Sequence, residues 1–208
     1  MLAWIFAAVC MVLAWLVFKA YFTRDPPRQI QPGSFIVSPA DGIVGTIFRT
    51  GEKEKGQLRI KKGVFGKIRA SAEDVAKKAV VICIVMRVWD VHVQRSPIDG
   101  KVTSVKYRKG NFLNAVKDPG SMAAFENEKN EILIEGKGTR AKVIQIAGLV
   151  ARRIECFVRP KDSLLKGVRI GRINLGSQVV LILPDTVKVK VREGQKVYGG
   201  TTVVAEAK

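Results

Sequence analysis

The single histidine of the chain, His92, is the side chain best suited to acid–base chemistry near neutral pH. It lies in residues 88–97, where apolar and polar residues alternate. If this segment is extended, alternation places Asp90, His92 and Gln94 on one face, opposite three apolar side chains. The residues alone leave two interpretations open, an acid/base site and a solvated strand face.

Gly176 and Ser177 form a second candidate site, directly before an apolar run at residues 178–183. A serine hydroxyl becomes a nucleophile once a base takes its proton, and a glycine carbonyl is unhindered. An ordinary turn before a strand has the same sequence, so the pair taken alone favours a turn.

One short motif occurs twice, as Ser-Pro-Ala-Asp-Gly at residues 38–42 and as Ser-Pro-Ile-Asp-Gly at residues 96–100. Proline fixes φ and glycine tolerates positive φ, so Pro-x-Asp-Gly predicts a turn. Each copy precedes a strand-like run. We therefore predict two equivalent turns, with Asp99 as a turn residue.

The elements that must position these residues begin with an uncharged apolar segment, residues 1–18. As a helix it spans roughly 27 Å, close to a hydrocarbon core of ~30 Å, and Trp4, Trp15 and Tyr21 suit the membrane interface. The alternative is a cleaved signal peptide, but no Lys or Arg precedes the run and no small-x-small cleavage site follows it. We therefore predict a retained transmembrane anchor at residues 1–23.

The segment after the anchor predicts the orientation of the protein. Asp25-Pro26-Pro27 ends the helix, because proline cannot continue it. Three basic residues follow the apolar run: Lys19, Arg24 and Arg28. By the positive-inside rule, a linker at residues 24–33 and the main domain at residues 34–208 lie on the cytoplasmic side of the cell membrane.

Short runs rich in valine and isoleucine, bounded by Gly, Pro and Asp, predict β-strands in the rest of the chain. They cover residues 42–48, 79–85, 101–107, 131–134, 141–146 and 178–183. Only residues 71–78 and parts of 115–128 have a helical pattern. We predict a mainly β (α+β) fold, a compact sandwich or barrel-like domain.

Residues 189–205 alternate around turns at Glu193-Gly194 and Gly199-Gly200. Such hairpins resemble those of biotinyl and lipoyl carrier domains, although no lysine stands at an attachment site on a hairpin tip. We interpret the pattern as architecture.

The chain carries 36 Lys and Arg against 18 Asp and Glu, a formal net charge of +18. This balance predicts an anionic partner, either nucleic acid or an anionic membrane surface. The densest basic cluster consists of Lys53, Lys55, Arg59, Lys61, Lys62, Lys67 and Arg69. With Phe65 as its only aromatic residue, it lacks the interleaving typical of single-strand binding. We interpret the cluster as a solvated basic loop and strand that can bind phosphate headgroups, and expect a membrane as the partner and no nucleic acid.

Cysteine usage predicts neither a disulfide framework nor a metal site. The three cysteines, Cys10, Cys83 and Cys156, are widely spaced without a CxxC pair, and one histidine cannot complete a zinc site with them. We interpret them as reduced, small apolar residues.

Three motifs occur in a fixed order along the chain: residues 38–42, residues 90–100, and Ile-Gly-Arg-Ile-Asn-Leu-Gly-Ser-Gln-Val-Val at residues 170–180. Together they resemble the phosphatidylserine decarboxylase family in its short form, over nearly the whole chain including the apolar N-terminus. Further segments that resemble the family lie at residues 110–115, 126–128 and 145–154.

Members of this family are proenzymes that cut themselves at a Gly-Ser bond, which the resemblance places at Gly176–Ser177. Ser177 would become a covalent pyruvoyl group at the head of an α chain, residues 177–208, which stays associated with a β chain, residues 1–176. The pyruvoyl group would form a Schiff base with a serine-headgroup phospholipid and accept electrons as CO₂ leaves. The lipid tails, acyl chains or archaeal isoprenoid ethers, stay open, as does a homo-oligomer.

The resemblance assigns acid–base roles to His92 and an orienting role to Asp41, as in other Ser/His/Asp arrangements. Many members carry two histidines three residues apart, and Arg95 stands at the second position, the one associated with self-cleavage. Either His92 serves both steps, or another group supports cleavage. A second departure is Gln178, where the family often has threonine.

Two other classes of protein are alternatives to this enzyme. One is a non-enzymatic, membrane-tethered basic module that binds anionic lipid or nucleic acid. The other is a serine hydrolase built on Ser177 and His92, although it would lack a Gly-x-Ser-x-Gly elbow. Self-cleavage would consume Ser177, so an intact serine in the mature protein would indicate the hydrolase.

Overall fold

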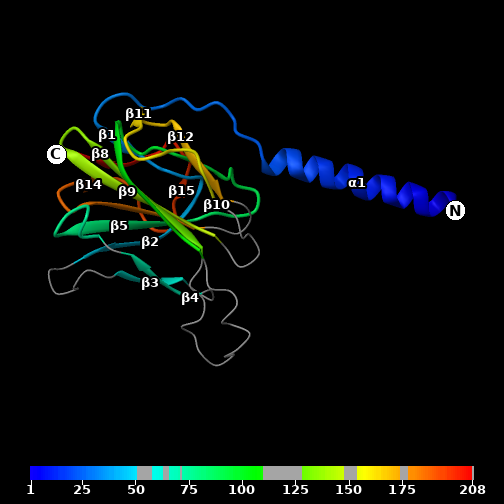
Figure 1. Cartoon of the computed structure of the whole chain (residues 1–208), viewed down its shortest axis with the longest axis horizontal. Helices are drawn as coiled ribbons and strands as arrows, with labels where there is room; N and C mark the ends of the chain where they lie inside the picture. The colour runs from blue at the N-terminus through cyan, green and yellow to red at the C-terminus, as the bar shows by residue number, and fades with distance from the viewer. Residues whose placement is uncertain are drawn as a thin grey trace.

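The computed structural model describes residues 1–50, 58–62, 66–70, 72–109, 128–147, 154–173 and 178–207. One helix, α1 (Leu2–Phe22), projects away from a β-rich body (Figure 1). The helix is long and apolar enough to cross a membrane. Its buried residue is Phe22, at the end that meets the body. The prediction of a mainly β fold with one apolar N-terminal helix is confirmed.

Eight strands form one curled antiparallel sheet, in the order β11-β7-β8-β9-β13-β5-β2-β15 (Figure 1). In that order their bounds are Ser163–Leu164, Gly100–Arg108, Lys129–Gly136, Thr139–Ile146, Gln178–Pro184, Ala79–Val85, Gly42–Arg49 and Lys196–Val197. All six strands that the valine- and isoleucine-rich runs predict lie in this sheet, so those predictions are confirmed.

The other described strands form two small sheets and a hairpin. The first sheet has the order β1-β16-β14, with bounds Phe35–Val37, Val203–Glu206 and Lys188–Val189. The second has the order β10-β12-β6, with bounds Ile154–Cys156, Arg169–Ile173 and Val93–Arg95. The hairpin joins β3 (Leu58–Lys62) to β4 (Gly66–Ala70), and the basic cluster of the sequence falls partly on it and partly outside the described residues.

Strand β13 lies in the middle of the large sheet, between β5 and β9. Two apolar clusters cover the two faces of this region, so residues 79–84 of β5 are all buried. A strand buried on both faces needs a continuous apolar run rather than an alternating one, and both β5 and β13 have such a run. The residues after Ser177 therefore begin in the centre of the fold.

The two Ser-Pro-x-Asp-Gly turns have the same structure, as predicted. The hydroxyls of Ser38 and Ser96 each donate to the carbonyl two residues further on, at 2.7 Å. Asp41 and Asp99 each accept a backbone N–H from a later turn, also at 2.7 Å. The glycine that ends each copy lies so close to a neighbouring strand that an added Cβ would be 2.5 Å from a backbone oxygen.

The helix predicted at residues 71–78 is wrong over the described part, residues 72–78. A single turn forms there, in which the N–H groups of Val75 and Ala76 donate to the Ala72 carbonyl. One turn is too short to offset the unfavourable nucleation of a helix, and the chain then enters β5. The helix predicted at residues 115–128 lies outside the described residues, apart from Glu128.

The C-terminal turns at Glu193-Gly194 and Gly199-Gly200 are confirmed. Gly194 and Gly200 have φ angles of 82° and 78°, in the left-handed region that favours glycine. These turns place β15 against β2 and bring Gly199 to the Asp41 carboxylate.

The three cysteines are free, and Cys83 is the buried one. Burial raises the pKa of the Cys83 thiol to about 11, with the charge of Glu193 as a smaller cause. Because the thiolate is the reactive form, iodoacetamide at about pH 8 should label the exposed Cys156 and leave Cys83 unlabelled in folded protein. Peptide mass spectrometry measures both sites, with urea-unfolded protein as the control in which both react. Equal labelling of the two thiols in folded protein would contradict this expectation.

Candidate active site

His92 lies just before β6, and its side chain is fully buried. Nδ1 is 2.7 Å from the backbone carbonyl of Asp90. A carbonyl can only accept, so Nδ1 carries the ring proton and Nε2 keeps its lone pair. Nε2 is buried and has no hydrogen-bond partner among the described residues. A neutral imidazole with an unused acceptor nitrogen is what a general base requires.

The surroundings of His92 favour this neutral form. Burial is the largest influence and lowers the pKa of His92 below its usual value. The hydrogen bond to the Asp90 carbonyl and the charge of Asp90 act in the opposite direction, while the positive charge of Arg24 lowers the pKa further. His92 is therefore an uncharged base at neutral pH.

A chain of buried amide side chains holds the His92 backbone in place. Gln94 Nε2 donates to the His92 carbonyl at 2.9 Å, and Gln145 Nε2 donates to Gln94 Oε1 at 2.8 Å. Asn130 Nδ2 completes the chain by donating to Gln145 Oε1 at 2.8 Å. The three amides come from β6, β9 and β8, so they tie the segment of His92 to the large sheet. With Asp90, His92 and Gln94 all buried, the interpretation as a solvated strand face is wrong.

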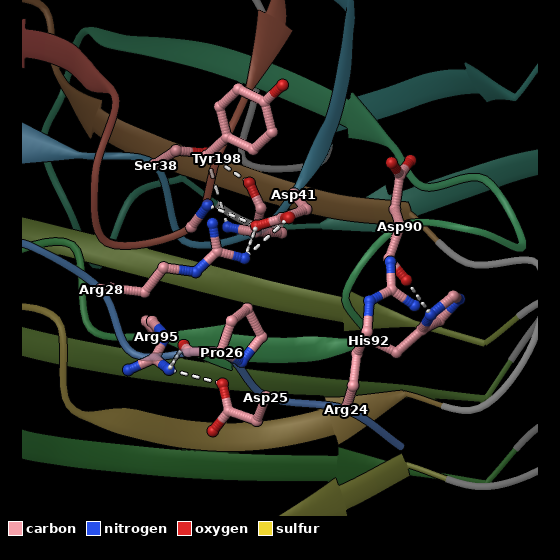
Figure 2. A network of polar contacts seen from close by, with 12 residues as sticks. Arg24, Asp25, Pro26, Arg28, Ser38, Asp41, Asp90, His92, Arg95 and Tyr198 are labelled. Carbon is pink, nitrogen blue, oxygen red and sulfur yellow. Dashed lines mark hydrogen bonds and ion pairs between the residues drawn. The ribbon is translucent and has the colours of Figure 1, made fainter. Parts of the chain in front are cut away.

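Asp41 is buried near this site but has other partners. Its carboxylate lies 2.9 and 3.0 Å from a guanidinium nitrogen of Arg28, and it accepts the Gly199 N–H at 2.7 Å (Figure 2). The hydrogen bond that orients the His92 ring is instead donated by its Nδ1–H to the Asp90 carbonyl. Asp41 acts on His92 through its charge, which favours the protonated imidazole.

Arg95, where the family resemblance implied a second histidine, binds the segment after α1. Its guanidinium lies 2.5 Å from Asp25 and donates to the Gly167 carbonyl at 2.9 Å (Figure 2). Asp25 also pairs with Arg169. Arg95 thus holds a structural ion pair, and its charge is matched by that of a carboxylate.

The segment at the end of α1, residues 22–28, forms one side of the site. The Phe22 ring packs against the His92 imidazole, with ring centroids 4.1 Å apart. Asp25 and Arg28 of the same segment bind Arg95 and Asp41, as described above. Sequence reasoning missed these contacts, although the charges of the segment are a signal: Arg24 and Arg28 predict only the membrane orientation, and Asp25 only the end of the helix.

The candidate cleavage bond, Gly176–Ser177, lies outside the described residues, as do residues 174 and 175. The described residues on either side of them lie next to His92 and in the middle of the large sheet. Ile173, the last residue of β12, donates its N–H to the His92 carbonyl at 3.2 Å. Gln178, the first residue of β13, pairs with Val85 on one side and Ile146 on the other.

Comparison with known proteins gives a consistent result. The family model for phosphatidylserine decarboxylase matches residues 15–205. The phosphatidylserine decarboxylase proenzyme of Beijerinckia indica is 38% identical, over 97% of this chain and 84% of that protein. Those of Burkholderia ambifaria and of the Wolbachia of Brugia malayi are 40% and 39% identical, over 92% and 98% of this chain and 79% and 81% of theirs.

The fold, the buried base and these relatives define the chain as an enzyme of the carboxy-lyase class. It belongs to the phosphatidylserine decarboxylase family, which confirms the resemblance seen in its motifs. The non-enzymatic basic module is thereby excluded as a description of the chain. In the described part of the molecule, no group of His, Cys, Asp and Glu side chains is arranged to hold a metal ion.

Proposed function

We propose that the protein decarboxylates the serine headgroup of a phospholipid to an ethanolamine lipid, using a pyruvoyl group that it makes from Ser177. The observation that carries this proposal is the buried, unpartnered Nε2 of His92. The His92 carbonyl accepts a hydrogen bond from the N–H of Ile173, which lies four residues before Ser177. Four residues reach at most about 14 Å, so this distance along the chain allows the candidate bond to reach the base.

In the first step, His92 Nε2 would take the proton of the Ser177 hydroxyl as its oxygen attacks the Gly176 carbonyl carbon. The C–N bond then breaks, the amine takes a proton, and an ester replaces the amide. Loss of the α-proton of residue 177 expels the Gly176 carboxylate and leaves dehydroalanine. Water converts this group to pyruvoyl and releases ammonia. One water is consumed and one ammonia is lost.

In our proposal, the negative charge of Asp41 supports the proton transfer from Ser177 to His92. Deprotonation of a serine leaves a proton on the imidazole, and a nearby carboxylate stabilises the imidazolium that forms. The pair with Arg28 and the bond from Gly199 keep the Asp41 carboxylate in one place. Arg95 has no acid–base role here, because its guanidinium stays protonated and is paired with Asp25.

The mature site is suited to a pyruvoyl group because it is buried and contains an unpaired base. When present, that group would supply the electron-accepting carbonyl that decarboxylation requires. His92 would take a proton from the substrate ammonium at Nε2 and return it to the α-carbon after CO₂ leaves. A single neutral imidazole can thus act first as base and then as acid.

Cleavage would leave residues 1–176 and 177–208 held together by the sheet. Strand β13 pairs with β5 along seven residues and with β9 along five. Strands β15 and β16 pair with β2 and β1, which belong to the larger piece. We therefore propose that the α and β chains stay associated without a disulfide.

We propose the domain order of a membrane anchor at residues 1–23, a linker at 24–33 and a catalytic domain at 34–208. The basic residues after the apolar helix favour a domain on the cytoplasmic side of the cell membrane. A phospholipid substrate stays in the bilayer, so an anchored site remains next to it. Acyl and isoprenoid ether tails are both compatible with a site that acts on the headgroup.

Intact-mass spectrometry of the purified full chain tests this proposal. We expect two pieces that match residues 1–176 and 177–208, with a pyruvoyl end on the smaller one. The two masses should sum to the mass of the precursor plus one water minus one ammonia. The same preparation should release CO₂ from a serine phospholipid in mixed micelles. A single uncut chain would exclude the pyruvoyl mechanism.

A further inference from the structure

Arg24 lies two residues beyond the end of the apolar helix. The helix Leu2–Phe22 has 21 residues and spans about 32 Å, close to the ~30 Å of a hydrocarbon core. If the helix crosses the bilayer, Arg24 lies at the depth of the phosphate groups. Trp89, which is 57% exposed, contacts the same end of the helix and suits this interface.

The charge of Arg24 has no partner of opposite sign among the described residues. Its guanidinium donates to the Trp89 carbonyl at 2.5 Å and to the Tyr21 carbonyl at 2.7 Å, and it stacks on the Tyr21 ring at 3.7 Å. All of these partners are neutral. The other arginines around the site differ, since Arg28 and Arg95 are paired with carboxylates.

Two of the five N–H donors of the Arg24 guanidinium are thus used to fix its position, and the others have no hydrogen-bond partner within the described ranges. A guanidinium held in this way is pre-organised for a phosphate, which it can bind with two parallel hydrogen bonds. Surface charges that merely attract a membrane need no such fixation.

Arg24 also lies beside the catalytic base. Figure 2 shows its side chain running next to His92, and its charge is near enough to lower the pKa of that imidazole. In a serine phospholipid, one oxygen and one methylene join the phosphorus to the reacting α-carbon. A phosphate bound at Arg24 would therefore hold the α-carbon within a few bonds of the proton-transfer atom.

We infer that Arg24 binds the phosphodiester of the substrate lipid and so positions its serine headgroup at His92. This inference rests on the proposed function, and it makes the end of the anchor part of the substrate site. Phe22, on the same turn, packs on the imidazole, so one short segment both covers the base and binds the substrate.

Kinetics of Arg24→Gln test the assignment. A charge-assisted hydrogen bond contributes about 1.5–3 kcal/mol, so we expect KM for a serine phospholipid to rise about tenfold to hundredfold. Self-cleavage, which involves no lipid, should proceed as in the wild type. Arg24→Lys should recover part of the loss, because it keeps the charge without the planar fork.

Two control variants distinguish phosphate binding by Arg24 from two other effects. These are the contact of the helix end with Trp89 and the loss of any positive charge near Trp89. Tyr21→Phe removes the hydroxyl that also contacts the Trp89 carbonyl, without changing charge. Arg87→Gln removes a charge from a side chain that stacks over Trp89, 5.8 Å from the ring centroid. Both should keep KM within about twofold of wild type, given the small effect of surface charges. An equal rise in KM for Arg87→Gln would overturn the assignment.

A binding experiment keeps the inference independent of turnover. Calorimetry compares two detergent-solubilised proteins, Ser177→Ala and the double variant Ser177→Ala/Arg24→Gln. The ligand is glycerophosphoserine, which has the phosphodiester and serine but no tails. Ser177→Ala, which keeps Arg24, should bind it more tightly. We expect Arg24→Gln to weaken this binding about tenfold or more. Equal binding by both proteins would show that Arg24 contacts only neighbouring bilayer lipids, and would overturn the inference. Loss of self-cleavage in Arg24→Gln would overturn it too, by assigning Arg24 a structural role.

Discussion

We expect Ser177→Ala to yield a single uncut chain with no decarboxylase activity. Alanine has no hydroxyl to attack the Gly176 carbonyl, so neither the ester nor the pyruvoyl group can form. The expected effect is complete, because the same atom is the nucleophile of cleavage and the precursor of the reactive group. Intact mass reports the first loss and CO₂ release from a serine phospholipid reports the second.

Ser163→Ala is the matched control for this change. Ser163 is an exposed residue of β11 at the edge of the large sheet, so its replacement should leave cleavage and turnover as in the wild type. Circular dichroism should show the same strand content in both variants. If Ser177→Ala were still cut into the two expected pieces, the scissile bond would be elsewhere. Turnover by the uncut variant would refute the role of the pyruvoyl group.

The strands of this fold could be predicted because they depend on local sequence. Continuous apolar runs mark β5 and β13, which are buried on both faces, and Pro-x-Asp-Gly marks both turns. Residues 72–78 show the limit of such reasoning. The segment has a helical pattern, but its Ala72 and Val75 pack under the sheet after one turn.

The candidate site was predicted only in part, because its contacts join segments far apart in the sequence. The motifs identify His92 and Asp41, but Arg28, which pairs with Asp41, comes from the segment between α1 and β1. In the sequence, Phe22 only extends an apolar run, and nothing there indicates that its ring packs against an imidazole. The role of Arg95 as a partner in an ion pair depends on Asp25, which comes from a distant part of the chain.

Lys142 of β9, which lies away from the site, is another residue whose contacts could not be predicted from local sequence. Strand alternation would place it in solvent, but it is 1% exposed and pairs with Asp74 at 2.7 Å and Glu131 at 3.1 Å. A buried lysine is tolerated when carboxylates neutralise it, and those partners lie in other segments. Ion pairs between distant segments, both here and around Asp41, are what local patterns could not supply.

His92→Ala should lower decarboxylation by about a hundredfold to ten-thousandfold, the usual contribution of a general acid–base group. In our proposal His92 also activates Ser177, so self-cleavage should slow in the same variant. Timed intact-mass measurements follow cleavage, and turnover is then expressed per pyruvoyl-bearing chain to separate the two steps. Normal cleavage with lost turnover would restrict His92 to decarboxylation. Normal turnover per cleaved chain would refute its assignment as the acid–base group.

The pH profile of the wild-type enzyme tests the state of this imidazole. Burial lowers the pKa of His92, so the neutral form that accepts the substrate proton persists as the pH falls through about 6.5, the ordinary histidine value. We expect kcat/KM, measured on enzyme matured at neutral pH, to keep more than half of its plateau at that pH and to fall only in more acidic buffer. The direction follows because protonation removes the base, and a lowered pKa moves that loss to lower pH. An acid limb with its midpoint at or above about 6.5 would mean that His92 is not buried and unpaired in the working enzyme.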